Sequence, residues 1–327
     1  MPFSKGTYEN LITEQSETQR RLFAQYSGPN LDFDVIIVGS GMGGGILADD
    51  LADTSTKRIL VLEAGSYLFP THVYNTGRLP NADVARKYAV KTFTQAGDDN
   101  AEYHIHEYPQ LNFGGRSIFW SGLIPTIQPW ELAFFPPGVR VGINRRLDDA
   151  GLKLNASITM GQKAQEIVHA LRQSPLADHF IIQETPRALH QPYLTAAGTP
   201  KDEFWIEPTG VFNTAELLVN QLGLNPDNPN LANSQQLQVL LNHYLETVER
   251  LPTGRYELNV KDVVAERVRQ FTASTVVLAA GSIESPKIVR RSPIFNTLPV
   301  ASQGLVGKGL TDHPTTHWID ALVTHIG

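Results

Sequence analysis

A glycine-rich turn between two apolar segments is the feature that most constrains the fold of this chain. Residues 34–38 read Asp-Val-Ile-Ile-Val, and residues 39–44 match the pattern GxGxxG. A second apolar run begins near residue 58 and ends at Glu63. A strand, a glycine turn, a helix and a second strand ending in an acid form the βαβ unit that binds adenine dinucleotides. The sequence therefore predicts an α/β fold with a parallel, Rossmann-like sheet and a dinucleotide site at its first turn.

Each glycine of this turn has its own predicted role. Gly39 allows the tight turn, Gly41 lets the backbone approach a pyrophosphate, and Gly44 lets the helix that begins near Met42 pack on the strand. The phosphates are expected at the helix N-terminus, where N–H groups and the helix dipole favour negative charge. Glu63 is placed to accept hydrogen bonds from ribose hydroxyls, and an acid there disfavours the 2′-phosphate of NADP. The motif alone leaves FAD and NAD open.

Composition excludes several classes of function. The chain has 327 residues, of which 41% are apolar and 18% charged, as in ordinary globular proteins. This length fits about two domains, or one α/β domain with an insertion. The net charge is −6 and lysine and arginine form no run, so nucleic-acid binding is not expected. The absence of cysteine excludes disulfides, thiolate catalysis and cysteine-bound metals, and it fits a cytoplasmic location.

The chain divides into four regions of different texture. Residues 1–30 predict a polar, helical lead-in, and no apolar stretch approaches the roughly 20 residues of a membrane span. Residues 31–135 hold the βαβ unit and a second glycine turn. Residues 136–230 carry many prolines and no βαβ repeat, which indicates a cap or substrate-domain insertion. Residues 231–327 return to strand patterns and are assigned to the second part of the nucleotide-binding domain.

Shorter elements follow from local patterns. Helices are predicted near 162–173 and 214–222, and strands near 102–108, 238–241 and 274–278, while residues 258–268 are predicted to form a strand or a hairpin. The apolar run ending at Leu278 is typical of a parallel strand covered on both faces. It passes through small residues into a helix, which brings backbone close to a ligand. Pro286 is expected in the first turn of that helix.

Two histidine pairs are candidates for metal or catalytic groups. His104 and His106 share one side of a predicted strand, but no third ligand stands at a suitable spacing, so no metal site is predicted. His313 and His317 stand four residues apart, and Pro314 between them disturbs a shared helical face. No catalytic residue is assigned.

Four motifs in order resemble those of the glucose-methanol-choline oxidoreductases, flavoproteins that use FAD. The first is the turn at 39–44 with Glu63-Ala64-Gly65, and the second is the double glycine with its flavin-contacting segment at 114–122. The third is an apolar strand leading into Ala-Gly-x-x-x-Ser-Pro at 278–286, and the fourth is a glycine-rich loop ending in Asp-His-Pro at 307–314.

The resemblance implies FAD, with its adenine half on the first motif and its isoalloxazine near 114–121. The cofactor-binding residues that it implies are Gly39, Gly41, Gly44, Glu63, Ala64, Gly65, Gly114, Gly115, Ser117, Trp120, Ser121, Ala280, Gly281, Asp312 and His313.

Two departures from the family pattern matter. Many members have Asn where this chain has Trp120, and the segment from Ser117 is closer to the sugar-oxidising pyranose branch. A His in the place of Phe119 bonds covalently to the flavin in that branch, so Phe implies noncovalent FAD. In the family a catalytic histidine with a second His or Asn lies in a C-terminal section beyond the Asp-His-Pro motif, whereas this chain stops at Gly327. That section is expected to be absent, which would leave apolar surface exposed.

The resemblance implies oxidation of an alcohol or sugar CH–OH donor by hydride transfer to flavin N5, with help from a base. The alternative is a truncated or non-catalytic flavin-binding fragment that lacks the catalytic histidine.

A disulfide reductase would need a redox cysteine pair and a second GxGxxG, and a hydrolase would need GxSxG, HExxH or a Walker A pattern; the sequence has none of these. An NAD-dependent dehydrogenase leaves the motifs at 114–122 and 278–286 unexplained. The motifs specify neither the donor, the electron acceptor nor the oligomeric state.

Overall fold

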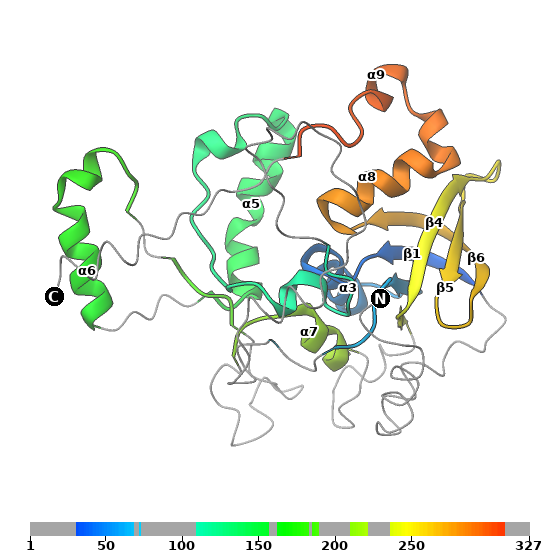
Figure 1. The fold of residues 1–327 in the computed structure, drawn as a ribbon, viewed down its shortest axis with the longest axis horizontal. Coiled ribbons are helices and arrows are strands. Elements are labelled where there is room, and N and C mark those ends of the chain that lie inside the picture. Colours follow the sequence, from blue (N-terminus) through cyan, green and yellow to red (C-terminus); the bar gives the residue numbers. More distant parts are fainter. Residues whose placement is uncertain are drawn as a thin grey trace, which may run out of the picture.

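One six-stranded sheet organises the part of the chain that the computed structural model describes, which is residues 31–68, 72, 109–156, 162–182, 185–189, 210–221 and 236–310 (Figure 1). The strands are β1 (Asp32–Val38), β2 (Ile59–Leu62), β3 (Leu237–Leu240), β4 (His243–Arg250), β5 (Tyr256–Asp262) and β6 (Arg267–Leu278). The α-helices are α3 (Met42–Thr54), α5 (Pro137–Lys153), α6 (Gln162–Arg172), α7 (Thr214–Gln221), α8 (Gly281–Arg291) and α9 (Val300–Gln303). The 3₁₀ helices are η2 (Gly115–Ile118), η3 (Pro129–Leu132), η4 (Pro175–Asp178) and η7 (Pro293–Thr297).

The sheet is mixed, with the strand order β3-β2-β1-β6-β5-β4. Strands β3, β2, β1 and β6 are parallel to one another, and Ile36 of β1 stands between Leu60 of β2 and Val276 of β6. Strands β6, β5 and β4 are antiparallel. The long strand β6 pairs with β5 over its first half and with β1 over its second half, so one strand joins the two parts of the sheet. The predicted fold class is therefore confirmed.

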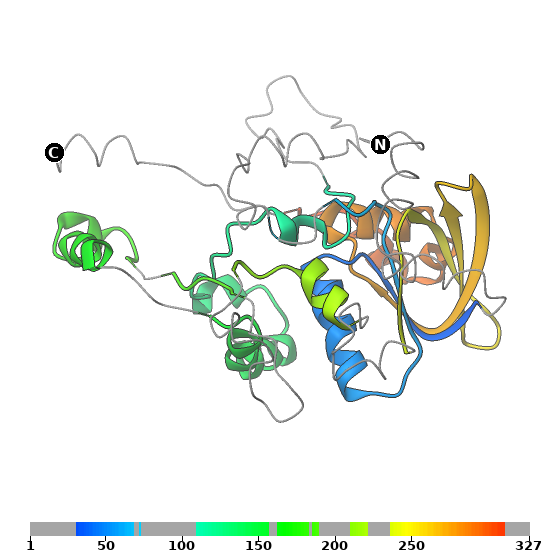
Figure 2. The same ribbon diagram turned by 90° about the horizontal axis from the view of Figure 1, so that it is seen from below.

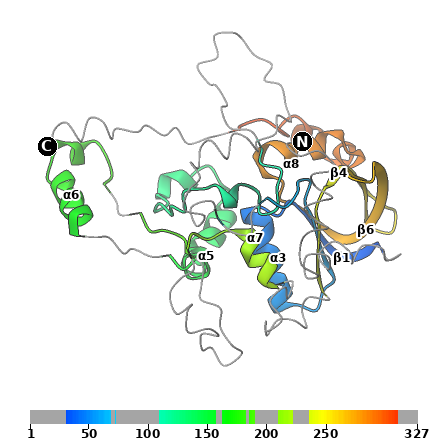
Figure 3. The same ribbon diagram turned by 60° about the horizontal axis from the view of Figure 1, so that its bottom comes forward.

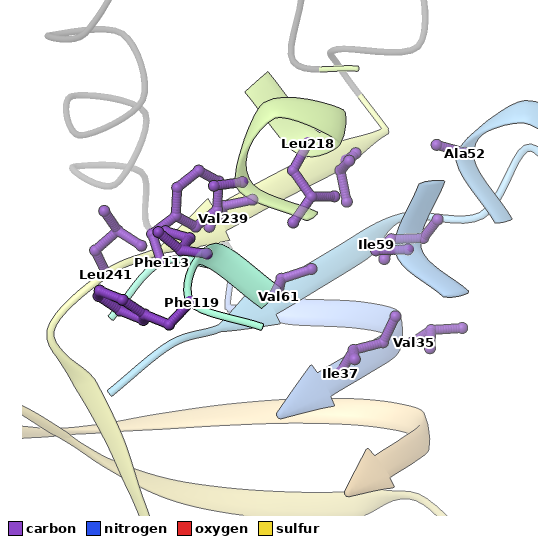
Figure 4. Packing of buried hydrophobic residues seen from close by; sticks show 14 residues of the cluster. Val35, Ile37, Ala52, Ile59, Val61, Phe113, Phe119, Leu218, Val239 and Leu241 are labelled. Atoms are coloured by element: carbon purple, nitrogen blue, oxygen red, sulfur yellow. The ribbon is translucent and has the colours of Figure 1, made fainter. Parts of the chain in front are cut away.

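Both faces of the parallel strands are covered. On one face Val35 and Ile37 pack with Val61, Phe113 and helices α3 and α7 (Figure 4). On the other face a second apolar cluster joins the parallel strands to β4, β5, β6 and α8; its members include Ile36, Val38, Leu258, Phe271 and Ile288. Burial on two faces explains why these strands are continuous apolar runs and do not alternate with polar residues.

Helix α7 lies beside α3 against the sheet (Figures 2 and 3). A Cβ atom on Gly45 of α3 would lie only 2.5 Å from the Cβ atom of Thr214, so the absence of a side chain there permits the contact. Helix α7 falls within the range assigned to the cap, and yet it packs on the first helix of the βαβ unit. The domain boundaries themselves stay a prediction.

Helices α5 and α6 have no buried residue. Helix α6 lies at the opposite end of the molecule from the antiparallel strands (Figures 1 and 2). One contact between α5 and the sheet's helical layer is an ion pair, in which Lys153 Nζ lies 2.8 Å from Asp49 Oδ2 of α3. Among the described helices, none combines the length and apolarity that a membrane span requires.

Most local predictions agree with the structure. The helices predicted near 162–173 and 214–222 correspond to α6 and α7. Of the two alternatives for 258–268, strand or hairpin, the structure has the hairpin, which β5 and β6 form. Strand β4 was not predicted, because its buried positions include a histidine, and α5 was not predicted, because it has no apolar stripe. The placement of Pro286 was wrong: α8 begins at Gly281, so the proline lies inside the helix and not in its first turn. The predicted lead-in at 1–30 and the strand 102–108 with His104 and His106 lie outside the described residues.

Candidate dinucleotide site

A cavity of about 350 Å³ lies at the carboxyl ends of the parallel strands β1, β2 and β6. Its walls come from the glycine turn, the end of β2, the segment 109–117, the start of β4 and the segment 279–288. The volume falls within the range of about 300–1,000 Å³ that is usual for small-molecule sites. The carboxyl edge of a parallel sheet is also where open α/β folds bind their ligands.

The glycine turn is closed toward the protein and open toward the cavity. Gly39 has φ +100°, in the left-handed region, and a Cβ atom there would lie 2.5 Å from the carbonyl oxygen of Ala279. By contrast, a Cβ atom on Gly41 would have only the Cα atom of Gly115 as a neighbour, at 4.0 Å, and one on Gly43 would have none within 4 Å. Helix α3 begins here with no side-chain cap and no acid in its first turn. The exposed backbone N–H groups therefore fit an anion such as a pyrophosphate.

Glu63 is buried at the end of β2 and lines the cavity. Its Oε2 accepts hydrogen bonds from the Ser40 N–H group at 3.1 Å and the Ser40 hydroxyl at 2.6 Å, and its Oε1 accepts one from the Gly65 N–H group at 2.9 Å. Burial raises the pKa of this carboxyl, against the lowering effect of those hydrogen bonds. Glu63 therefore holds the glycine turn in place, and a ribose hydroxyl at this carboxylate would share it with Ser40.

Hydrogen bonds hold the second glycine motif against the first. The Gly114 N–H group donates to Ser40 Oγ at 2.9 Å, and Ser117 Oγ donates to the Gly114 carbonyl at 2.5 Å. The hydroxyl of Thr214, the first residue of α7, donates to the Ser40 carbonyl at 2.7 Å and lies 2.9 Å from Ser117 Oγ. This buried hydroxyl network joins three segments that are far apart in the sequence. The sequence analysis assigned no role to Thr214. The available signal was its position, because it is a hydroxyl residue at a predicted helix start.

The structure brings many of the predicted cofactor residues together. Those that line the cavity are Gly39, Gly41, Glu63, Ala64, Gly115, Ser117, Ala280 and Gly281. Gly44 lies behind it, since a Cβ atom there would lie 1.9 Å from the Gly39 carbonyl oxygen. Gly65 packs equally closely on the backbone of Leu111, since a Cβ atom on Gly65 would lie 1.9 Å from the Leu111 carbonyl carbon. Gly114 anchors η2 through Ser40.

Trp120 and Ser121 are not among the residues that line the cavity. The Trp120 indole donates to the Phe212 carbonyl at 2.7 Å, and the Ser121 carbonyl accepts from Arg187 Nη1 at 2.9 Å. Asp312 and His313 lie outside the described residues. Direct contact of all these residues with a cofactor stays a prediction.

Six further polar residues line the cavity and were not predicted: Gln110, Arg116, His243, Tyr244, Ser282 and Glu284. Glu284 is buried in the first turn of α8, where its carboxylate lies 2.6 Å from Lys287 Nζ and accepts a hydrogen bond of 3.4 Å from the Tyr244 hydroxyl. Burial lowers the pKa of His243, whose Nδ1 lies 2.8 Å from the Leu241 carbonyl oxygen. Because β4 was not predicted, nothing in the sequence analysis brought His243 and Tyr244 to the site. Across the described ranges, no group of three or more acidic or histidine side chains is arranged to hold a metal ion.

The fold and this cavity are of the kind found in dinucleotide-binding α/β proteins. The chain is 24% identical to mitochondrial choline dehydrogenase of Mus musculus over 319 residues, which cover 86% of this chain and 50% of that protein. The crystal structure of pyridoxine 4-oxidase from Mesorbium loti matches with a TM-score of 0.49 and 16% identity, over 79% of this chain and 51% of that one. The chain thus spans about half the length of these proteins, and no family model matches it. The similarity to choline dehydrogenase agrees with the resemblance of the four ordered motifs to those of the glucose-methanol-choline oxidoreductases.

Proposed function

We propose that this chain binds FAD noncovalently and is the cofactor-binding part of an oxidoreductase that acts on alcohol or sugar CH–OH donors. The main support is that residues from three of the four family motifs line one cavity at the carboxyl edge of the parallel strands. A nucleotide fold without flavin chemistry would require only the first of these motifs. Bound FAD would supply the hydride acceptor, its N5 atom.

The residues at the cavity suit separate parts of the cofactor. The N–H groups at the start of α3 would hold the pyrophosphate, because no side chain caps them and Gly41 and Gly43 leave room in front of them. Glu63 would accept a ribose hydroxyl, and η2 would border the isoalloxazine half. Phe119 is buried in the apolar cluster, and its phenyl ring cannot form a covalent bond to a flavin (Figure 4).

The binding proposal is tested by adding FAD to the purified chain and measuring flavin retention after gel filtration. Acid precipitation should then release the flavin into the supernatant. Gly41→Asp places a carboxylate where the pyrophosphate would lie, without a clash inside the protein, and should abolish retention. Gly138→Asp is the matched control, since it adds the same charge at the exposed start of α5 and should bind FAD like the wild type. Equal retention by the two variants would contradict the proposal.

A second candidate function is flavin binding without turnover. It is favoured by the absence of any residue of 136–230, the predicted substrate region, among the described residues that line the cavity. Anaerobic addition of choline, glucose or a short primary alcohol to the FAD-loaded chain distinguishes the two. Bleaching of the flavin absorbance supports an active oxidoreductase, and a stable spectrum with every donor supports binding alone.

A further inference from the structure

The charges at the cavity are unevenly distributed. Glu63 and Glu284 are both buried there, and both already accept hydrogen bonds from protein groups. Of the described residues that line the cavity, Arg116 is the one with a permanently positive side chain. Glu284 is paired with Lys287, and the pyrophosphate of FAD would bring two further negative charges to a cavity lined by these two acids. Backbone N–H groups supply only partial positive charge, so a cation beside them would add substantially to binding.

The local fold fixes where Arg116 stands. Its neighbours on η2 are held by protein contacts: a Cβ atom on Gly115 would lie 3.1 Å from the Cα atom of Gly41, and Ser117 Oγ accepts a 3.0 Å hydrogen bond from the Thr214 N–H group. Ile118 is buried in the apolar cluster. Arg116 is the exposed residue of this turn and lines the cavity. Its backbone is therefore held directly beside the glycine turn, at the opening where α3 begins.

We propose that Arg116 is a further cofactor-binding residue whose guanidinium pairs with the pyrophosphate of FAD. The inference rests on the proposed FAD binding and adds a charged contact that the glycine motifs do not contain. A guanidinium presents two parallel N–H donors to phosphate oxygens, and the main-chain anchors of η2 hold in place the backbone that carries it. Arg116 would act on cofactor affinity and would have no part in hydride transfer.

Calorimetric titration of the flavin-free chain with FAD, ADP and adenosine tests this pairing. Arg116→Gln should weaken FAD and ADP binding by about 10- to 100-fold and leave adenosine binding unchanged, because adenosine has no phosphate. Arg116→Lys keeps the charge but lacks the two parallel N–H donors, so its loss of FAD affinity should be smaller than that of Arg116→Gln. The wild-type affinity for FAD should also fall more steeply with added salt than that of Arg116→Gln. Arg146→Gln is the matched control, because that side chain is 82% exposed on α5 and does not line the cavity.

The outcomes separate this inference from the proposed function. If Arg116→Gln binds FAD as tightly as Arg146→Gln, or loses ADP and adenosine affinity equally, the pairing with pyrophosphate is wrong while FAD binding stands. If the folded wild-type chain binds neither FAD nor ADP, the proposed function fails and the inference fails with it. Thermal melting of each variant without ligand verifies that the comparison is made between folded proteins.

Discussion

The parallel strands and helices α5 and α6 are stabilised in different ways. All four residues of β2 are buried, whereas none of the 17 residues of α5 is buried. Near α5, Trp130 and Phe134 are 69% and 76% exposed, although both are large and apolar. The strands are thus specified by their own packing. The helices are connected to the rest of the described chain by a few polar and local contacts, such as the Lys153–Asp49 ion pair.

This difference shows at which positions of the described chain the fold restricts the residue type. In the sheet region, single atoms matter, since a methyl group on Gly44 or Gly65 would overlap backbone atoms. In the helical region, Gly138, Gly142 and Gly151 have nothing within 4 Å of a would-be Cβ atom. Substitutions should therefore have very different costs in the two regions.

The largest expected effect is that of Gly44→Ala. The new Cβ atom would lie 1.9 Å from the Gly39 carbonyl oxygen, and neither backbone segment can move without disturbing β1. We expect a loss of about 3 kcal/mol or more in the free energy of unfolding, measured by urea denaturation. Gly142→Ala, in the middle of α5, is the control and should be neutral or stabilising by up to about 1 kcal/mol. Similar values for the two variants would remove the proposed difference between the regions.

Glu63→Ala should cost about 2 to 3 kcal/mol, because it leaves the Ser40 and Gly65 donors without their acceptor. The more conservative Glu63→Gln variant tests the electrostatics. Because burial raises the folded-state pKa of Glu63, its contribution to stability is greatest below the unfolded-state pKa and falls as the pH rises toward the folded-state value. The wild type should therefore lose stability relative to Glu63→Gln as the pH rises above the unfolded-state value of about 4.3. A difference that grows in favour of the wild type over this range would show that the pKa is lowered instead.

Thr214→Val probes the hydroxyl network with little change of shape. The variant removes the donor to the Ser40 carbonyl and the partner of Ser117, and should cost about 1 to 2 kcal/mol. Thr297→Val removes an exposed local hydrogen bond to Ile294 and should change the free energy of unfolding by less than about 0.5 kcal/mol. Chemical denaturation of the three proteins under one condition makes the comparison. Equal losses would mean that the buried network adds nothing to the tie between α7 and the glycine turn.

The smallest effect is expected at the exposed aromatic residues. Phe134→Ser should change the stability of the chain by less than about 0.5 kcal/mol, because the ring is 76% exposed and few contacts are lost. Differential scanning calorimetry at several protein concentrations provides the measurement. A loss above 1 kcal/mol, or one that depends on concentration, would show that this ring is covered in solution and that the contrast between the regions is weaker than described.

Local backbone roles could be predicted from the sequence where a single residue type was required, whereas contacts between distant segments could not. Gly39 and Gly44 were assigned correct local roles, because only glycine tolerates the backbone contacts at these positions. Thr214 and Ser40 are 174 positions apart, and no local pattern announces their hydrogen bond. Arg116 was missed because the neighbouring glycines and serine carry the motif while its charge does not.

The order of strands in the sheet also has a consequence for biosynthesis. Strand β1 is flanked by β2, its neighbour in sequence, and by β6, in which Val276 is the partner of Ile36. Strand β2 likewise pairs with β3 from residues 237–240. At about 5–20 residues per second, the ribosome needs on the order of ten seconds or more to supply those partners. During that interval the unpaired edges and apolar faces of β1 and β2 are exposed on the nascent chain, so productive folding of this sheet depends on protection from aggregation until β6 has emerged.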